Sequence, residues 1–134
     1  MSALTPHVLE ALSVDECLQL LATRSVGRIA FAHDGDPQIF PVNYQLHEGA
    51  IVFRTDYGGL LDAIHLSIAA FEVDAIDPEY RTGWSVVVHG RAEEVWKPAE
   101  LVPLRTLNLR PWAPGARDHY VRIFPRSITG RRIK

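Results

Sequence analysis

Arg54, Thr55 and Gly58 are the residues of this sequence whose types and spacing best suit the binding of an anion. Arg54 and Thr55 follow the apolar residues 51–53, which are typical of a buried strand, and Gly58 and Gly59 precede a short apolar run with helical spacing. A guanidinium, a hydroxyl and the free N–H groups at a helix start can together bind a phosphate. The same order of residues is also ordinary turn chemistry, so a plain strand-to-helix turn is the alternative interpretation.

Other reactive side chains form no recognisable catalytic or metal-binding pattern. His65, His89 and His119 lack metal-ligand spacing, and we interpret them as surface or hydrogen-bonded structural histidines. Glu72 and Asp74 lie two residues apart on an expected strand, where a solvated face or an arginine partner is favoured over a metal site. We therefore predict no metal, and the catalytic residues stay unassigned.

Length and composition predict one globular domain over residues 1–134, with 47% hydrophobic and 22% charged residues. The net charge of −2 argues against a general nucleic-acid binder. The single cysteine, Cys17, excludes an intrachain disulfide and is expected to be a small buried hydrophobe. Because we find neither a membrane-spanning apolar run nor a secretory signal pattern, we expect a cytoplasmic protein with no membrane partner.

Periodicity and turn signals predict a mainly β domain with a few short helices. Ser13 and Glu16 form a capping box that predicts a helix ending near residues 23–25. The alternating runs predict strands at 26–32, in the two arms of a hairpin within 38–59, and at 69–75, 84–95 and 120–128. Further helices are expected at 60–67 and from Pro98 to 110, and residues 130–134 are interpreted as a basic tail. The pattern favours an α+β fold built on a small antiparallel barrel.

Two details of these elements are also predicted. Val86, Val87 and Val88 are consecutive β-branched residues, which indicates a strand covered on both faces. Gly90 is expected to mark a bulge in that strand. The helix after Pro98 is expected to pack through Leu101, Leu104 and Leu107, and Pro103 would distort it unless it lies in the first turn.

A series of short motifs resembles one known family over about residues 15–134. The motifs are, in order, GRIAF, P-x-IFPVNY, IVFRT-x-x-G, AFEVD, RTGWSVVV-x-G-RAEEV, RPWAPG and ITGRR. Together they resemble the pyridoxamine phosphate oxidase-like, FMN-binding split-barrel family in its small single-domain form. The resemblance implies a six-stranded antiparallel split β-barrel with flanking short helices, a homodimer, and FMN bound in two symmetric sites between the subunits.

The resemblance also implies which residues contact FMN. They come from four segments: Phe40, Pro41, Val42 and Asn43; Arg54, Thr55 and Gly58; Trp84 and Ser85; and Trp112. The first segment would lie along the flavin ring and ribityl chain, and the second would face the phosphate. Ser85 would supply a polar contact, and Trp112 would lie near the ring from the other subunit.

The chain departs from the family pattern after Gly58. Relatives usually carry a lysine or arginine at the start of the following helix, whereas this chain has Gly59, Leu60 and Leu61. A charge-assisted hydrogen bond contributes about 1.5 to 3 kcal/mol, so its loss would weaken FMN binding by roughly ten- to a hundredfold unless another cation replaces it. Besides Arg54, the candidate replacements are Arg28, Arg81, Arg131 and Arg132.

These implications predict an FMN-dependent oxidoreductase acting on an unidentified small-molecule substrate. The flavin would carry the redox chemistry, and the protein would supply position, burial and electrostatics. One alternative is a reductase that uses a deazaflavin in the same cleft. Another is a non-enzymatic flavin carrier or sensor dimer, which the missing cation and the absence of catalytic residues would favour.

Overall fold

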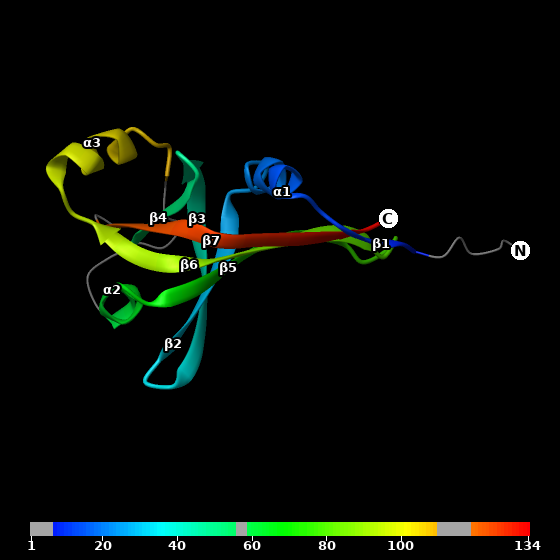
Figure 1. Ribbon diagram of the computed structural model, residues 1–134, viewed down its shortest axis with the longest axis horizontal. Helices are drawn as coiled ribbons and strands as arrows, with labels where there is room; N and C mark the ends of the chain where they lie inside the picture. Colours follow the sequence, from blue (N-terminus) through cyan, green and yellow to red (C-terminus); the bar gives the residue numbers. More distant parts are fainter. Residues whose placement is uncertain (1–6, 56–58, 110–118) are drawn as a thin grey trace, which may run out of the picture.

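The computed structural model describes residues 7–55, 59–109 and 119–134 (Figure 1). Its strands are β1 (Leu9–Ala11), β2 (Val26–His33), β3 (Asp36–His47), β4 (Ala50–Thr55), β5 (Ile68–Asp77), β6 (Thr82–Val95) and β7 (His119–Ile133). Its helices are α1 (Val14–Leu21), α2 (Gly59–Ile64) and α3 (Pro98–Arg105). Gly58 and Trp112, two of the predicted cofactor residues, lie outside the described residues. None of the described helices has the length and hydropathy needed to cross a bilayer.

The strands close into an antiparallel barrel. In the described part of the chain the order is β7-β4-β3-β2-β5-β6, and β6 pairs again with β7 to complete the ring. This arrangement confirms the predicted six-stranded barrel. The short β1, which was not predicted, adds to the outer edge of β7 through Leu9 opposite Ile133.

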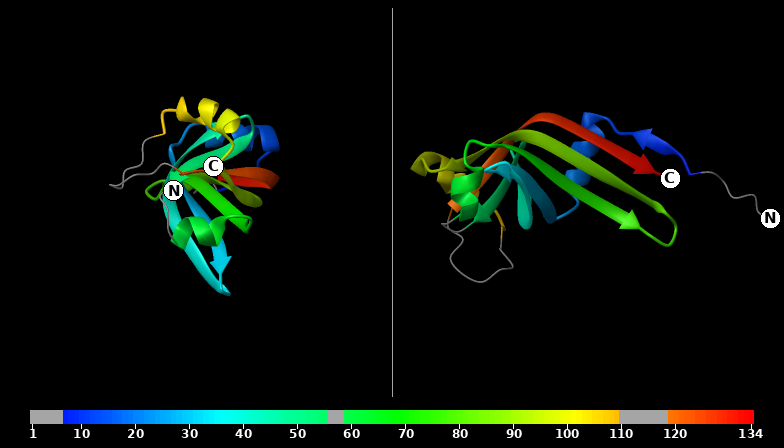
Figure 2. Two further views of the ribbon diagram at one scale, coloured as in Figure 1. Left: turned by 90° about the vertical axis from the view of Figure 1, so that its left-hand side faces the viewer. Right: turned by 90° about the horizontal axis from the view of Figure 1, so that it is seen from below.

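The ends of β5, β6 and β7 extend beyond the barrel as an arm, which β1 borders (Figure 2). The register of β6 against β7 shifts between His89 and Gly90, which confirms the predicted bulge. A Cβ on Gly90 would lie 2.1 Å from the carbonyl oxygen of Phe124, so only glycine fits there.

The interpretation of residues 130–134 as a basic tail was wrong. Residues up to Ile133 belong to β7, where Arg131 lies opposite both Ser85 of β6 and Ala11 of β1. Backbone pairing on both edges holds this segment in the sheet whatever the charge of its side chains. The arginines of the segment therefore have fixed positions on the arm.

The core lies inside the barrel and under α1. Phe71 and Tyr44 meet there edge to face, with ring centroids 4.9 Å apart, and Cys17 of α1 is fully buried as predicted. The predicted capping box of α1 is confirmed, because Ser13 N–H donates to Glu16 Oε1 at 3.0 Å and Ser13 Oγ accepts from Glu16 N–H at 3.1 Å.

A second, smaller apolar cluster lies under α3. Leu104 is buried there, and Leu101 and Leu107 pack against the cluster, as predicted for the inner side of this segment. The helix contains Pro103 and ends at Arg105. Its packing covers the outer side of β4 and β7 at the end of the barrel opposite the arm (Figure 1).

Candidate functional site

A continuous row of side chains crosses the outer face of five strands. Pro41, Arg28, Glu72, Val87 and Thr129 are direct cross-strand neighbours on β3, β2, β5, β6 and β7. Directly paired residues in antiparallel strands point to the same side of the sheet. Val87 is only half-buried there, while Val86 and Val88 are fully buried on the inner face, so the strand is covered completely on one side only.

The next row brings two of the predicted cofactor segments onto this outer face. Asp74, Ser85 and Arg131 are direct neighbours on β5, β6 and β7, two residues along each strand from the first row. Asn43 lies two residues from Pro41 on β3 and so shares its face. The fold therefore places Pro41, Asn43 and Ser85 on one surface, although 40 residues separate the two segments in the sequence.

Strand alternation turns the other residues of these segments away from that surface. Phe40 stacks on Phe31, with ring centroids 6.2 Å apart and 38% of Phe40 exposed. Val42 and Trp84 pack against the main core. The predicted segments are thus divided between the two faces of the sheet, because a cofactor lying on one face meets alternate side chains and the intervening backbone.

An arginine and two carboxylates lie at the centre of the outer face. Arg28 Nη1 is 3.3 Å from Glu72 Oε1 and 3.7 Å from Asp74 Oδ2, which confirms the predicted arginine partner. Burial, a hydrogen bond with Asp74 and the negative charge of Asp74 raise the pKa of Glu72 to about 7, although Arg28 opposes them. Glu72 therefore changes its protonation state near neutral pH.

Arg54 follows Phe53 of β4, which pairs with Tyr44 of β3, so it lies one register step from that pair on the side of Asn43. Its Nη1 donates to the carbonyl oxygen of Leu109 at 3.0 Å, and its guanidinium lies 5.5 Å from the centroid of Tyr120. Thr55 is buried, with 1% exposed, and pairs opposite His119. These contacts position Arg54 at the end of β4, and its predicted role at a phosphate stays a prediction.

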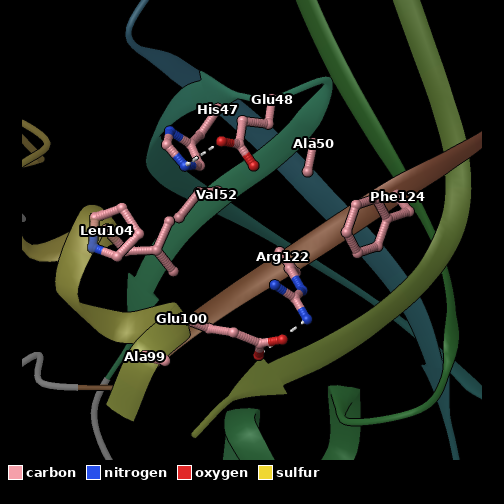
Figure 3. Close-up of a pocket in the computed structure, with 10 residues that line it drawn as sticks. His47, Glu48, Ala50, Val52, Ala99, Glu100, Leu104, Arg122 and Phe124 are labelled. Carbon is pink, nitrogen blue, oxygen red and sulfur yellow. Dashed lines mark hydrogen bonds and ion pairs between the residues drawn. The ribbon is translucent and has the colours of Figure 1, made fainter. Parts of the chain in front are cut away.

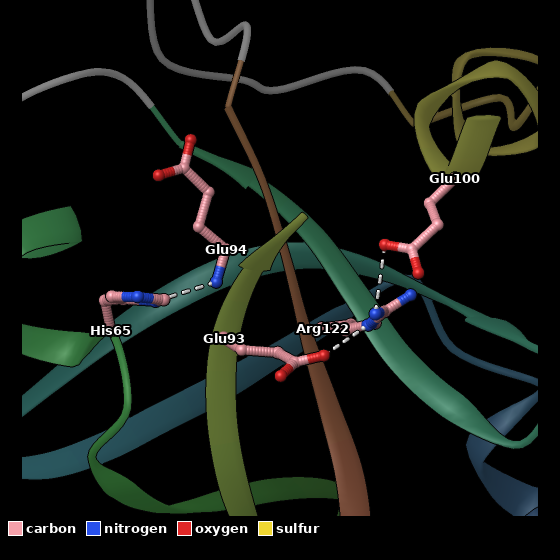
Figure 4. Close-up of polar contacts among 5 residues, drawn as sticks. All are labelled: His65, Glu93, Glu94, Glu100 and Arg122. Atoms are coloured by element: carbon pink, nitrogen blue, oxygen red, sulfur yellow. Dashed lines mark hydrogen bonds and ion pairs between the residues drawn. The ribbon is translucent and has the colours of Figure 1, made fainter. Parts of the chain in front are cut away.

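Two of the histidines are hydrogen-bonded to one glutamate near this end of the barrel, and Figure 4 shows the first of the two contacts. His65 Nδ1 accepts from the backbone N–H of Glu94 at 3.0 Å, and His119 Nδ1 lies 2.7 Å from Glu94 Oε2. His89 is exposed on β6. These positions agree with the interpretation of the three as structural or surface histidines.

Two hollows flank Ser85 and Arg131 on the arm, and sequence reasoning did not predict them. One, of about 370 Å³, lies toward the β5–β6 turn and includes Arg81. The other, of about 410 Å³, lies toward β1 and includes Val87. The motif match at Ser85 and the arginines of residues 130–134 were the signals available in the sequence, but their proximity depends on the pairing of β6 with β7.

A third cavity, of about 270 Å³, lies between α3, β4 and β7 (Figure 3). Arg122 in this cavity is bound by Glu93 at 2.7 Å and Glu100 at 3.2 Å, as Figure 4 shows, and its guanidinium lies 5.0 Å from the centroid of Phe124. Glu48 adds another carboxylate to the cavity lining. Because two carboxylates already neutralise the arginine, this cavity is a poor site for an anion.

The closed six-stranded antiparallel barrel, its protruding arm and its open outer face define a split-barrel protein of the pyridoxamine phosphate oxidase-like class. The pyridoxamine 5'-phosphate oxidase family model matches residues 13–132, and the chain belongs to that family.

Individual relatives agree with this assignment. The uncharacterized protein Rv0080 of Mycobacterium tuberculosis is 39% identical over 125 residues, which cover 89% of this chain and 82% of that protein. The structure of an FAD-binding protein from Mycobacterium smegmatis has a TM-score of 0.78 at 36% identity, and the match covers 91% of this chain and 96% of that chain. The structure of an FAD-binding protein from Mesorhizobium loti has a TM-score of 0.79 at 25% identity, and the match covers 96% of this chain and 99% of that chain.

Proposed function

We propose that this protein is a flavin-dependent oxidoreductase that binds FMN on the outer face of its sheet, between two copies of the chain in the cytoplasm. The observation that supports the proposal is the common surface formed by Pro41, Asn43 and Ser85, which are three of the residues predicted to contact the cofactor. The FAD-binding relatives from Mycobacterium smegmatis and Mesorhizobium loti support a flavin as the ligand.

The chemistry of this face fits a flavin. Val87 and Thr129 at one end of the row offer small side chains on which a planar ring can lie, and Ser85 offers a hydroxyl to a polar ring edge. Pro41 lies at the other end of the row, beyond Arg28 and Glu72. The proposed contacts also include the backbone around Phe40, Val42 and Trp84. A bound flavin would supply hydride or electron transfer.

Arg54, Thr55 and Gly58 are the proposed phosphate end of this site, and Trp112 is proposed to approach the ring from the second copy. Arg54 Nη1 already donates a hydrogen bond to the carbonyl oxygen of Leu109 at 3.0 Å. We expect the Leu109 contact to orient Arg54 rather than to replace the proposed role.

The proposed dimer follows from the apolar side chains exposed on the same face. Ile39 is 65% exposed on β3, and Leu9 is 59% exposed on β1. Large apolar side chains left exposed on one face of a sheet are a feature of interaction surfaces. A second copy of the chain would cover these residues and complete the cofactor site.

The experiment that tests this proposal places a long side chain at Val87, beside the proposed ring position. In Val87→Arg the new guanidinium can pair with Glu72 opposite, so the fold is maintained while the ring position is filled. We expect at least a tenfold weaker affinity for both FMN and riboflavin, measured by flavin fluorescence quenching. Riboflavin lacks the phosphate, so its response reports on the ring alone.

Val102→Arg is the matched control, because Val102 is 62% exposed on α3, away from the proposed face. Wild-type flavin affinity in Val87→Arg, with an unchanged melting temperature, would contradict the proposed site. Oxidation of a reduced nicotinamide by the FMN-loaded wild-type protein with an electron acceptor separates the enzyme from a flavin carrier. Tighter binding of a deazaflavin than of FMN would indicate the alternative cofactor.

A further inference from the structure

The hollow at the tip of the arm has the composition of a binding site for a small organic anion. We propose that it binds the substrate, an aromatic or aliphatic molecule that carries a carboxylate or a phosphate monoester; this assignment rests on the proposed function, since Ser85 links the hollow to the proposed flavin face. The hollow is lined by Ile76, Asp77, Pro78, Arg81, Thr82, Gly83, Trp84, Ser85, Arg131 and Ile133.

The floor of the hollow is apolar and follows from the strand register. Ile76, Gly83 and Ile133 are direct neighbours on β5, β6 and β7, and Ile76 and Ile133 are 63% and 40% exposed. A Cβ on Gly83 would lie 2.4 Å from the carbonyl oxygen of Ala75, and its φ of 152° also favours glycine. The floor therefore consists of two isoleucines with a glycine between them, an apolar surface that suits the apolar body of a ligand.

Two arginines supply the positive charge. Arg131 stands opposite Ser85 at one end of the floor, and Arg81 lies in the β5–β6 turn at the other. Within the described ranges neither arginine forms an ion pair with a carboxylate. Guanidinium groups without a protein partner, next to a hydroxyl, can bind a carboxylate or phosphate through charge-assisted hydrogen bonds.

The other candidate cations are placed differently. Arg28 is occupied by Glu72 and Asp74 on the outer face. Arg132 lies on the opposite side of β7 from Arg131, because neighbouring strand residues alternate. Among the described residues, Arg81 and Arg131 are the two of these four arginines that line this hollow together.

One carboxylate, that of Asp77, also lines the hollow, and it is hydrogen-bonded within the β5–β6 turn. Asp77 Oδ1 accepts from the backbone N–H groups of Glu79 at 3.0 Å and Tyr80 at 3.2 Å, which caps the β5–β6 turn. The lining therefore contains two guanidinium groups and one carboxylate, and that carboxylate is hydrogen-bonded to backbone amides. The net charge of the hollow is positive, as anion binding requires.

The size and place of the hollow favour a substrate over a second cofactor. Its volume of about 370 Å³ lies at the lower end of the range for small-molecule sites. It shares Ser85 and Arg131 with the neighbouring hollow beside β1. A ligand held by Arg131 would consequently lie next to the proposed cofactor surface.

The test uses phenyl phosphate and benzoate as probes of the two anionic groups, and benzyl alcohol as the neutral probe. Binding to the full chain is measured by calorimetry and by chemical-shift changes, without flavin and with FMN. We expect Arg131→Gln and Arg81→Gln each to weaken binding of the preferred anion by about tenfold or more. Benzyl alcohol binding should be unchanged, and the probe that binds more tightly identifies the anionic group.

Arg132→Gln is the control, because it removes the same charge from the next residue on the other side of β7. Equal weakening by Arg132→Gln and Arg131→Gln would overturn the proposal, as would the absence of anion binding in the wild-type protein. Flavin titration of the wild-type protein is a separate arm. Flavin binding without a response of the anions to Arg131→Gln would refute only the substrate hollow, whereas anion binding without any flavin binding would refute the proposed function and the substrate role.

Discussion

The raised pKa of Glu72 predicts that stability falls between about pH 4.5 and 7. The ordinary pKa of the side chain is 4.5, and its folded value is about 7. In this interval the folded state binds more protons than the unfolded state, so the free energy of unfolding decreases as pH rises. The difference corresponds to at most about 3 kcal/mol. Because 32% of the side chain is exposed and solvent screens its interactions, we expect about 1 kcal/mol.

Glu72→Gln removes this titration and keeps an oxygen that accepts from Arg28. We expect nearly equal stability of variant and wild type at about pH 4, below both pKa values of Glu72, and a variant more stable by about 1 kcal/mol at pH 8. For a domain of this size the gain corresponds to a melting temperature higher by about 4 °C. Thermal unfolding at fixed protein concentration measures it, with Glu79→Gln in the exposed β5–β6 turn as control. A difference between Glu72→Gln and wild type that does not change with pH would refute the reasoning.

Three further substitutions test the packing. Gly27→Ala would place its Cβ 2.3 Å from the ζ carbon of buried Phe71, so we expect a loss of about 1 to 3 kcal/mol in urea unfolding; wild-type stability would show that the ring can shift without cost. Tyr44→Phe removes the hydroxyl that donates to the carbonyl oxygen of Leu21, and we expect about 1 to 3 kcal/mol lower stability in the same assay, whereas no loss would mean that water satisfies that carbonyl. Ser13→Ala removes the cap of α1 and should lower stability by about 1 kcal/mol; a neutral result in thermal unfolding would show that other contacts hold the helix start.

Local signals predicted much of the fold. The capping box at Ser13 and the alternation within β2, β5 and β6 are properties of neighbouring residues, so they could be interpreted without knowing the rest of the chain. Barrel closure, β1 and the end of β7 depend on pairing between distant segments. The charges of residues 130–134 indicated a solvent-exposed tail. The backbone pairing that holds Arg131 in the sheet is independent of side-chain type, so the sequence did not indicate it.

For the candidate site too, local signals were predictable and long-range contacts were not. The resemblance located Ser85 and the 40–43 segment, but only the register shows that Pro41 shares a face with Ser85 while Phe40 turns away. The contact between Arg54 and Leu109 joins residues 55 positions apart, and no periodicity could indicate it. Arg131 became distinguishable from Arg132 once strand parity assigned each to one side of β7.

The pairing of β7 also determines when the protein can fold during synthesis. β7 contacts β4, β6 and β1, so the ring stays open until residues 119–133 have left the ribosome. Until then β4 and β6 present unpaired edges and uncovered apolar side chains, which are the features that promote association with other chains. A nascent chain stalled before this strand should therefore bind chaperones, and release of β7 should end that dependence.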